Sequence, residues 1–570
     1  MSEVTASGGT GTGRGSARND RQEGDGGDRG RGGEPPGTAR AAAGMGVITA
    51  LSRAVGFLRV LVVAAVLGTT YLGNAFQSAN SLSNVLFELL AAGALSAVLV
   101  PTFVELLERG DQAGAEEVAG RVLGVALAAL GAVTVVGVVA APLLARLLTA
   151  GVPAEVAGDQ QALVAYLLRF FIPQVMLYAA GTIAIAVLYA RRRFAITAAA
   201  PMGNTVVMVA CLVAFRSAAG ADPGLDLSDG ERLLLAAAGT GGVVAFVGSL
   251  LLACAASGFR LRPRRVRGDA RVTAVLRHSG WGVVLHTAGG LLLGAAIVAG
   301  SAVAGGVVAY QVGWVVFLAP YAVLAQPIHT AILPELVIEA RDEGRERVVR
   351  SLRWALERMA LLALPVTAAM VALALPAMRL VSFGETTPDG TRLLAAAVAG
   401  LAVGLVPYSA FLLFSRGYYA LGDSRTPGLW ALGSAAVGVA VMAVGAVAWD
   451  GAARVAVLGL GHSAAYGVGA VALAVGLVRR SATRLWPAAA VRMLAVSAVA
   501  GGLAWVVADV LLGADPSRMA DLVALAAAGA AGGAVVLAGY RVLHVPGSLT
   551  VRAAATGSAG AGDPSPGVPA

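Results

Sequence analysis

The sequence contains no lysine, only two cysteines and few charged residues of any kind, and each shortage narrows the class of protein. Charged residues make up 13% of the 570 residues, whereas soluble domains carry about 25%. With 57% hydrophobic residues and a mean hydropathy of +0.77, the chain has apolar runs that are long enough to lie in lipid. Cys211 and Cys254 are too few for a disulfide framework and have no metal-ligand spacing nearby, so we interpret them as small core residues.

Motifs that carry catalytic chemistry are also missing from the sequence. There is no Walker A sequence, no GxGxxG run followed by a sheet, no HExxH and no cysteine–histidine metal spacing. The net charge of +9 comes from short arginine clusters between apolar runs, which is typical of membrane topology rather than of nucleic-acid binding. We therefore expect neither an enzyme nor an ATP-driven pump, with no cofactor, no metal and no nucleic-acid partner. A transporter driven by an ion gradient or the membrane potential is the simplest remaining class.

Both ends of the sequence differ from the apolar middle. Residues 1–43 are rich in Gly, Arg, Asp and Glu, and residues 546–570 are rich in Ala, Gly, Ser and Pro. Such segments bury too little apolar surface to offset the entropy of ordering, so both are predicted to be disordered. The first segment also lacks the apolar core and cleavage site of a signal peptide.

Apolar runs follow one another closely between these tails, and each is long enough to cross about 30 Å of hydrocarbon as a helix. The sequence therefore predicts an all-α polytopic membrane protein with about fourteen transmembrane helices. The predicted spans lie near 44–68, 75–104, 121–146, 162–190, 195–216, 233–258, 278–302, 306–334, 352–378, 393–420, 427–449, 455–478, 487–512 and 519–543.

Arginines concentrate in alternate connections between these spans. The rich connections hold Arg191, Arg192, Arg193, Arg260, Arg262, Arg264, Arg265, Arg267, Arg271, Arg277, Arg341, Arg345, Arg347, Arg350, Arg425, Arg479, Arg480 and Arg484. The other connections hold fewer arginines, among them Arg216, Arg232, Arg392, Arg454 and Arg518. Because positively charged loops stay in the cytoplasm, the richer set is predicted to be cytoplasmic, with both termini on that side.

Ionisable residues at membrane depth are rare and usually face a cavity or a partner. Arg53 and Arg59 lie on either side of the midpoint of the first span, and Glu88 lies midway along the second. One interpretation is a cationic lining for an anionic substrate. The other is a structural ion pair with Glu88, and the sequence leaves both open.

Several uncharged polar residues and prolines also lie within the spans. Asn74 near the second span, His286 in the seventh and Gln311 in the eighth are candidate substrate-binding residues, although interhelical hydrogen bonding is favoured for the amides. A lone histidine such as His286 is commonly a hydrogen-bonded packing residue. Prolines interrupt several spans and could act as hinges or as simple kinks; they are Pro173, Pro320, Pro327, Pro365 and Pro407.

Four stretches of the sequence carry a family resemblance. They are Ser52-Arg53-Ala54-Val55-Gly56-Phe57-Leu58-Arg59, Gly93-Ala94-Leu95-Ser96 with Val100-Pro101, Arg193-Phe194-Ala195 followed by Ala200-Pro201 and Asn204, and Ser415-Arg416-Gly417-Tyr418-Tyr419-Ala420-Leu421-Gly422-Asp423-Ser424-Arg425-Thr426-Pro427. All four resemble stretches of the MurJ (MviN) family of lipid II flippases. The last is the most specific, resembles the family's connection between the tenth and eleventh spans and includes Arg416, Asp423 and Arg425. Ile332-Leu333-Pro334 also fits the end of the family's eighth span, and the resemblance covers about residues 44–545.

The resemblance implies two lobes of six helices and two extra C-terminal helices. These would be an N-terminal lobe over 44–258, a basic cytoplasmic connection over 259–277, a C-terminal lobe over 278–480 and the extra helices over 481–545. In the family, a central cationic cavity carries the pyrophosphate and sugar head group of an undecaprenyl-linked peptidoglycan precursor, and the last two helices are thought to offer a groove for the lipid tail. By position, Arg53 and Arg59 match the arginines that would bind the diphosphate, and guanidinium groups suit phosphate.

The sequence departs from the family at several charged positions. Family acids are replaced by Val60 and Asn74, and the paired arginines of the second span align with Phe87 and Glu88. The arginine and glutamate usual in the eighth span align near Val315 and Leu318. The cavity therefore carries less positive charge than is usual in the family.

These observations leave three hypotheses for the function. The first is a flippase in the bacterial cytoplasmic membrane that moves a polyprenyl-diphosphate-linked peptidoglycan precursor by alternating access, with that precursor, membrane lipids and cell-wall synthesis proteins as partners. The second is a divergent paralogue that exports another lipid-linked glycan or an amphipathic metabolite, which the missing arginines favour. The third is a membrane scaffold without transport, which should tolerate loss of Arg53 and Arg59.

Overall fold

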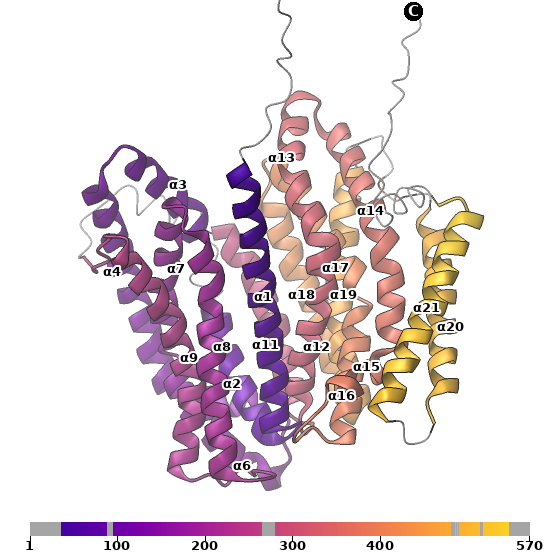
Figure 1. Cartoon of the computed structure of the whole chain (residues 1–570), viewed down its shortest axis with the longest axis horizontal. Coiled ribbons are helices and arrows are strands. Elements are labelled where there is room, and N and C mark those ends of the chain that lie inside the picture. Colours follow the sequence, from indigo (N-terminus) through magenta and orange to yellow (C-terminus); the bar gives the residue numbers. More distant parts are fainter. Residues whose placement is uncertain are drawn as a thin grey trace, which may run out of the picture. The chain divides into compact units, whose positions relative to one another are not determined.

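The computed structural model describes residues 36–87, 95–264, 280–479, 481, 485, 487, 489–513 and 517–545, and over these ranges it contains helices and no strands (Figure 1). Residues up to Val47 form a separate unit, and the arrangement described below concerns the unit that starts at Ile48. The predicted disorder of residues 1–35 and 546–570 lies outside the described residues. The first helix begins at Pro36, upstream of the boundary expected at residue 44.

The helices from residue 48 to 256 form a group that we call the N-lobe. Its core includes Phe76, Phe171 and Phe215, all fully buried, and Phe76 and Phe171 meet edge to face with ring centroids 5.8 Å apart. A second cluster holds Phe103 and Phe259. The helices are α1 (Pro36–Leu67), α2 (Tyr71–Phe87), α3 (Leu95–Glu108), α4 (Gln112–Val139), α5 (Ala141–Leu148), α6 (Ala154–Phe171), α7 (Gln174–Ala190), α8 (Phe194–Ala219) and α9 (Asp229–Ala256).

The helices from residue 280 to 478 form a second group, the C-lobe, around a larger core that includes Phe317, Leu352 and Phe414. Another cluster joins Val60 and Ala64 of α1 to this group, so α1 contributes to the packing of both lobes. The helices are α11 (Gly280–Gly300), α12 (Gly306–Pro320), the π-helical turn η2 (Tyr321–Ala325), α13 (Gln326–Asp342), α14 (Arg345–Ala372), α15 (Ala374–Val381), α16 (Pro388–Ala402), α17 (Leu405–Ala420), α18 (Arg425–Ala448) and α19 (Gly451–Val478).

The last two helices, α20 (Ala490–Leu511) and α21 (Arg518–Val542), pack on α14 and α15 of the C-lobe. The Tyr540 hydroxyl donates to the Leu361 carbonyl at 3.0 Å. Near the other end of α21, the buried carboxylate of Asp521 forms an ion pair with Arg379 of α15 at 3.6 Å. These two contacts fix α21 to the C-lobe at both of its ends.

Each of the fourteen predicted spans coincides with at least one helix, and the all-α polytopic fold is confirmed. Among the described residues, eleven helical segments are long and apolar enough to cross a membrane, and α16 with α17, bent by 42°, would make a twelfth. The second predicted span falls on α2 and α3, with 88–94 outside the described residues. The count of fourteen therefore stays a prediction.

Two of the prolines lie where a span is interrupted, because proline cannot donate the backbone hydrogen bond of a continuous helix. Pro173 separates α6 from α7, and Pro320 precedes the π-helical turn Tyr321–Ala325 between α12 and α13. Pro365, in contrast, lies inside the continuous helix α14. The sequence shows where breaks can occur, and packing decides which prolines produce one.

Candidate site at the lobe interface

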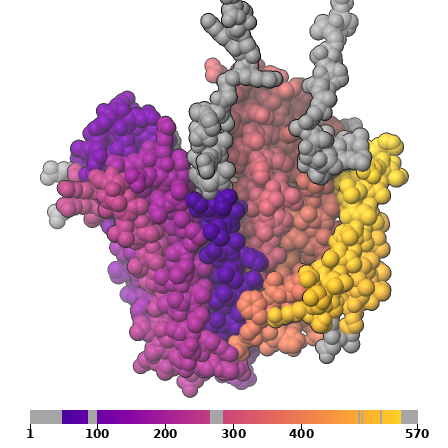
Figure 2. All heavy atoms as spheres, in the orientation of Figure 1, coloured from indigo at the N-terminus to yellow at the C-terminus, as the bar shows by residue number. Residues whose placement is uncertain are grey.

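The two predicted substrate cations, Arg53 and Arg59, lie on α1 between the lobes (Figures 1 and 2). Six residues apart on a helix, they are separated by about 9 Å along the axis and point from different faces. Arg53 is exposed, and its Nη2 donates to Oε1 of Gln326 in the C-lobe at 3.3 Å. Arg59 is half-buried and interacts electrostatically with Tyr178 of the N-lobe helix α7. One cation is therefore aimed at each lobe.

Among the described residues, no carboxylate forms an ion pair with Arg53 or Arg59. Glu88, the partner proposed from the sequence, lies outside the described residues. Tyr178, which interacts with Arg59, is an uncharged polar residue, and its hydroxyl donates to Asn84 of α2 at 3.4 Å. Arginine retains its charge under such conditions, so both groups are available to an anionic ligand.

Asn74 joins the two lobes through the start of α12. Its side-chain amide donates to the Val303 carbonyl at 2.7 Å, and its Oδ1 accepts from the backbone N–H groups of Val307 at 3.0 Å and Val308 at 3.4 Å. The side chain is fully buried and satisfies backbone groups that the first turn of a helix leaves without partners. In this conformation Asn74 thus makes interhelical contacts, and its role as a substrate ligand stays a prediction.

Gln311 also bridges the lobes, since its Nε2 donates to the Ser81 hydroxyl of α2 at 2.6 Å. Further contacts gather where the connections around Gly68, Gly305 and Glu385 meet, which we call the closed end. There Gly305, at φ +75°, lies so near Thr69 that a Cβ would overlap its backbone. The lobes are in direct contact at this end, where a side chain larger than glycine would hold them apart.

An ion pair strengthens the closed end. Arg216, at the end of α8 in the N-lobe, pairs with Glu385 between α15 and α16. The backbone N–H of Glu385 donates to the Ala65 carbonyl of α1 at 2.8 Å. Neither residue was identified from the sequence, because nothing local links positions so far apart.

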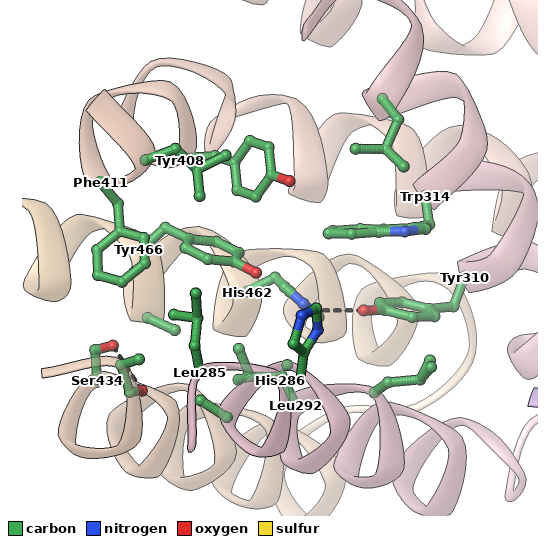
Figure 3. Close-up of a pocket in the computed structure, with 17 residues that line it drawn as sticks. Leu285, His286, Leu292, Tyr310, Trp314, Tyr408, Phe411, Ser434, His462 and Tyr466 are labelled. Atoms are coloured by element: carbon green, nitrogen blue, oxygen red, sulfur yellow. Dashed lines mark hydrogen bonds between the residues drawn. The ribbon is translucent and has the colours of Figure 1, made fainter. Parts of the chain in front are cut away.

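The predicted residue His286 lies in a different place, a cavity of about 540 Å³ inside the C-lobe. Residues of α11, α12, α17, α18 and α19 line it, and the rings of Tyr310, Trp314, Tyr408 and Tyr466 surround His286 and His462 (Figure 3). Sequence reasoning missed these aromatic residues and His462. The spacing of four residues in the pairs Tyr310/Trp314 and His462/Tyr466 was the available signal, because such residues share one helix face.

The three residues of the predicted connection motif have local roles in the structure. Asp423 accepts hydrogen bonds from the backbone N–H of Thr426 at 2.9 Å and from its hydroxyl at 2.6 Å, at the start of α18. Arg416 is half-buried near the end of α17, and Arg425 is exposed. Partial burial tends to raise the pKa of Asp423, but the hydrogen bonds from Thr426 and the charge of Arg345 outweigh it, so the pKa lies below its usual value.

A second, apolar cavity of about 330 Å³ lies between α14, α20 and α21. Small residues keep it open, including Gly501, Gly529, Gly532 and Gly533. Figure 2 shows α20 and α21 in yellow beside the C-lobe. This cavity has the position and apolar character expected of a groove for an alkyl chain.

The fold and these sites define a multi-pass membrane protein with two helical lobes that meet around α1. The family model for lipid II flippase MurJ matches residues 63–519, and the chain belongs to this family. A probable lipid II flippase MurJ of Rhizobium meliloti (strain 1021) is 27% identical over 414 residues, which cover 70% of this chain and 73% of the relative. A probable lipid II flippase MurJ of Vibrio cholerae is 25% identical over 395 residues, which cover 67% of this chain and 72% of the relative.

Solved structures support the same fold. A lipid II flippase MurJ in an inward closed conformation matches with a TM-score of 0.69 at 16% identity, covering 88% of this chain and 99% of that one. A multidrug resistance MATE transporter in an inward-facing conformation matches with a TM-score of 0.58 at 14% identity, covering 74% and 92%.

Proposed function

We propose that this chain is a flippase that moves lipid II, a polyprenyl-diphosphate-linked peptidoglycan precursor, across the bacterial cytoplasmic membrane by alternating access. The observation that carries the proposal is the pair Arg53 and Arg59, one cation toward each lobe and neither paired with a described carboxylate. Two guanidinium groups between movable lobes can bind a diphosphate bidentately and exchange contacts as the lobes move. Membership of the lipid II flippase MurJ family supports the substrate class.

The arrangement of contacts supports an inward-facing state. With both termini in the cytoplasm, as the arginine distribution predicts, the closed end faces outward. Asn74, Gln311 and the Arg216–Glu385 pair hold the lobes together on that side. The exposed guanidinium of Arg53 is then reachable from the inner leaflet, and the apolar cavity beside α20 and α21 can accept part of the lipid tail.

A second candidate function is export of a different lipid-linked glycan. It is favoured by Val315 and Leu318, half-buried residues at positions where the family usually carries an arginine and a glutamate. Fewer fixed charges weaken the attraction for a pyrophosphate, although water in the cavity limits the effect. Cell-wall synthesis proteins and membrane lipids remain predicted partners in both cases.

Complementation tests the proposal. We expect this chain, expressed in cells depleted of their own lipid II flippase, to restore exposure of lipid II on the outer leaflet. The double variant Arg53→Ala/Arg59→Ala should lose that activity by about tenfold or more, because each charge-assisted hydrogen bond contributes roughly 1.5–3 kcal/mol. The third hypothesis, a scaffold, predicts no such loss.

Arg146→Ala is a matched control, because Arg146 is an exposed arginine of the N-lobe that lies on α5 and not on α1. Membrane levels of all variants must be equal by immunoblot. A wild-type chain that is well expressed yet exposes no lipid II would contradict the proposal and favour the second candidate.

A further inference from the structure

The aromatic cavity of the C-lobe has no part in the diphosphate contacts described above. The cavity and the N-lobe lie on different sides of α12. Gln311 of this helix faces the N-lobe, whereas Tyr310 and Trp314 face the cavity. Trp314, Tyr408, Tyr466 and His286 are all half-buried, so their rings retain surface that a ligand can contact. At about 540 Å³, the cavity falls within the ~300–1,000 Å³ range of small-molecule sites.

Seven of the 17 lining residues of this cavity carry aromatic or imidazole rings. Tyr408 meets Tyr466 edge to face at 4.7 Å, and Trp314 lies 4.8 Å from the His462 ring, both measured between ring centroids. The Tyr310 hydroxyl and Nδ1 of His462 are hydrogen-bonded at 2.5 Å, which fixes one edge of the site. Such rings offer flat apolar faces together with N–H and O–H groups at their edges.

We propose that this cavity is a binding site for an uncharged sugar ring, namely the amino-sugar part of the transported head group. A pyranose has a face of C–H groups that packs on aromatic rings and a rim of hydroxyl and amide groups. The imidazole of His286, which has no hydrogen-bond partner among the described residues, can donate to or accept from that rim. Ser434 of α18 provides a further hydroxyl in the lining.

Charge argues against the other ligand that aromatic rings attract, an organic cation. None of the 17 lining residues is an aspartate or a glutamate. Moving an ion out of water into such a site costs more free energy than a single cation–π contact returns. A neutral, hydroxyl-rich ring loses far less hydration free energy than an ion when it leaves water, so the lining of this cavity favours a sugar over a cation.

The inference rests on the proposed function, because it assigns the sugar of the same substrate whose diphosphate would contact Arg53 and Arg59. The helix α12 connects the two sites, since consecutive residues Tyr310 and Gln311 face the cavity and the lobe interface respectively. A movement of α12 during the exchange between states therefore changes both sites together.

Binding of N,N′-diacetylchitobiose, a neutral amino-sugar disaccharide without lipid or phosphate, tests the site directly. The full chain is purified into nanodiscs, and binding is measured by saturation-transfer-difference NMR and calorimetry. We expect saturable binding that falls about tenfold or more in Trp314→Leu and His286→Leu, since the first variant loses a ring face for the sugar to pack on and the second loses a polar partner. Trp430→Leu is the matched control, because Trp430 is an exposed tryptophan on α18, outside the cavity.

The inference is overturned if folded wild-type protein shows no saturable binding of the disaccharide, or if both cavity variants bind it as wild type does. Tetraphenylphosphonium serves as the comparison ligand, and preferential binding of this cation in the same cavity would also overturn the assignment to a sugar. Lipid II exposure is assayed in parallel. If lipid II exposure depends on Arg53 and Arg59 but the disaccharide does not bind, only the sugar-site inference is refuted. If the disaccharide binds but lipid II is not exposed, the proposed substrate is refuted and the sugar site is retained.

Discussion

Asp423 shows how a single side chain positions a connection between spans. Its carboxylate accepts two hydrogen bonds from Thr426, and its own backbone N–H donates to the Tyr418 carbonyl at 2.9 Å. One residue thereby closes the end of α17 and starts α18, which is the usual role of an aspartate near a helix N-terminus. The same motif carries the most specific part of the family resemblance. The contacts of Asp423 give this residue of the motif a structural role.

We therefore expect Asp423→Ala to lower the stability of the folded protein by about 1 kcal/mol, as loss of a helix cap does. The lowered pKa gives the effect a pH dependence. A carboxylate with a depressed folded-state pKa stabilises above its unfolded-state pKa of about 3.9, and the stabilisation is lost as the pH falls through the folded-state value. Thermal unfolding in detergent at neutral and acidic pH measures the difference between variant and wild type.

The difference in stability between Asp423→Ala and the wild type should become smaller at acidic pH. Asp389→Ala is the control, because Asp389 is an exposed carboxylate whose ion pair with Arg392 lies on the surface. If Asp423→Ala were as stable as this control at neutral pH, the capping role would be refuted.

Contacts between helices explain how the closed end is held. Arg216 of α8 and Glu385 before α16 are partly exposed, with 35% and 19% of their side-chain surfaces accessible. Ion pairs of this exposure contribute little, up to about 1 kcal/mol. A contribution of this size cannot lock the lobes, but it can shift an equilibrium between two conformations of similar free energy.

Arg216→Ala should therefore open the closed end more often, by about twofold to fivefold. The measurement is the rate at which a thiol reagent modifies Thr69→Cys, since Thr69 is buried at this end. The native thiols Cys211 and Cys254 are first replaced by alanine. The exchanged pair Arg216→Glu/Glu385→Arg should return the rate toward that of the parent, and an unchanged rate in Arg216→Ala would rule out this contribution.

The whole molecule carries its arginines unequally between its two ends. Arg191, at the end of α7, donates to the Ser257 carbonyl and to Oε1 of Gln112 at 3.0 Å, so the arginine-rich connections near residues 191 and 257 meet the connection near residue 112 at one end of the N-lobe. The closed end, with Arg216, is the poorer one. Retention of positive loops in the cytoplasm then predicts the orientation of the whole chain.

Reporter fusions test this orientation. Green fluorescent protein fused after Ala570 should fluoresce, because it folds in the cytoplasm but not after export through the membrane unfolded. Alkaline phosphatase inserted at Asp222, in the connection between α8 and α9, should be active because that connection is expected outside. Phosphatase inserted at Arg192 is the control and should be inactive; the opposite pattern would invert the proposed direction of transport.

Much of the fold could be predicted because hydropathy is local. Every predicted span coincides with at least one helix, and the interruption at Pro173 agrees with the rule that proline ends a helix. The sequence did not show that α16 and α17 bend by 42°. Such breaks depend on which neighbouring helices can satisfy the freed backbone groups.

The site was predicted less completely. Arg53 and Arg59 were identified because charge at membrane depth is conspicuous in a sequence. The partners of Asn74 and the aromatic cavity around His286 were not, since these contacts join residues hundreds of positions apart, such as Asn74 with Val307. Side-chain chemistry suggested that the residues mattered without showing what they touch.

The sequence by itself determined a helical membrane protein, the places of its spans and the unequal charge of its two ends. These features follow from the lipid environment. A bilayer accommodates long apolar helices and disfavours charged residues, whatever tertiary contacts the residues make. Only the tertiary structure decided that Asn74 caps α12, that Arg53 and Arg59 face different lobes, and that Tyr310 and His462 enclose a cavity. Packing between distant segments is decided by the shape of many side chains at once, which no local pattern encodes.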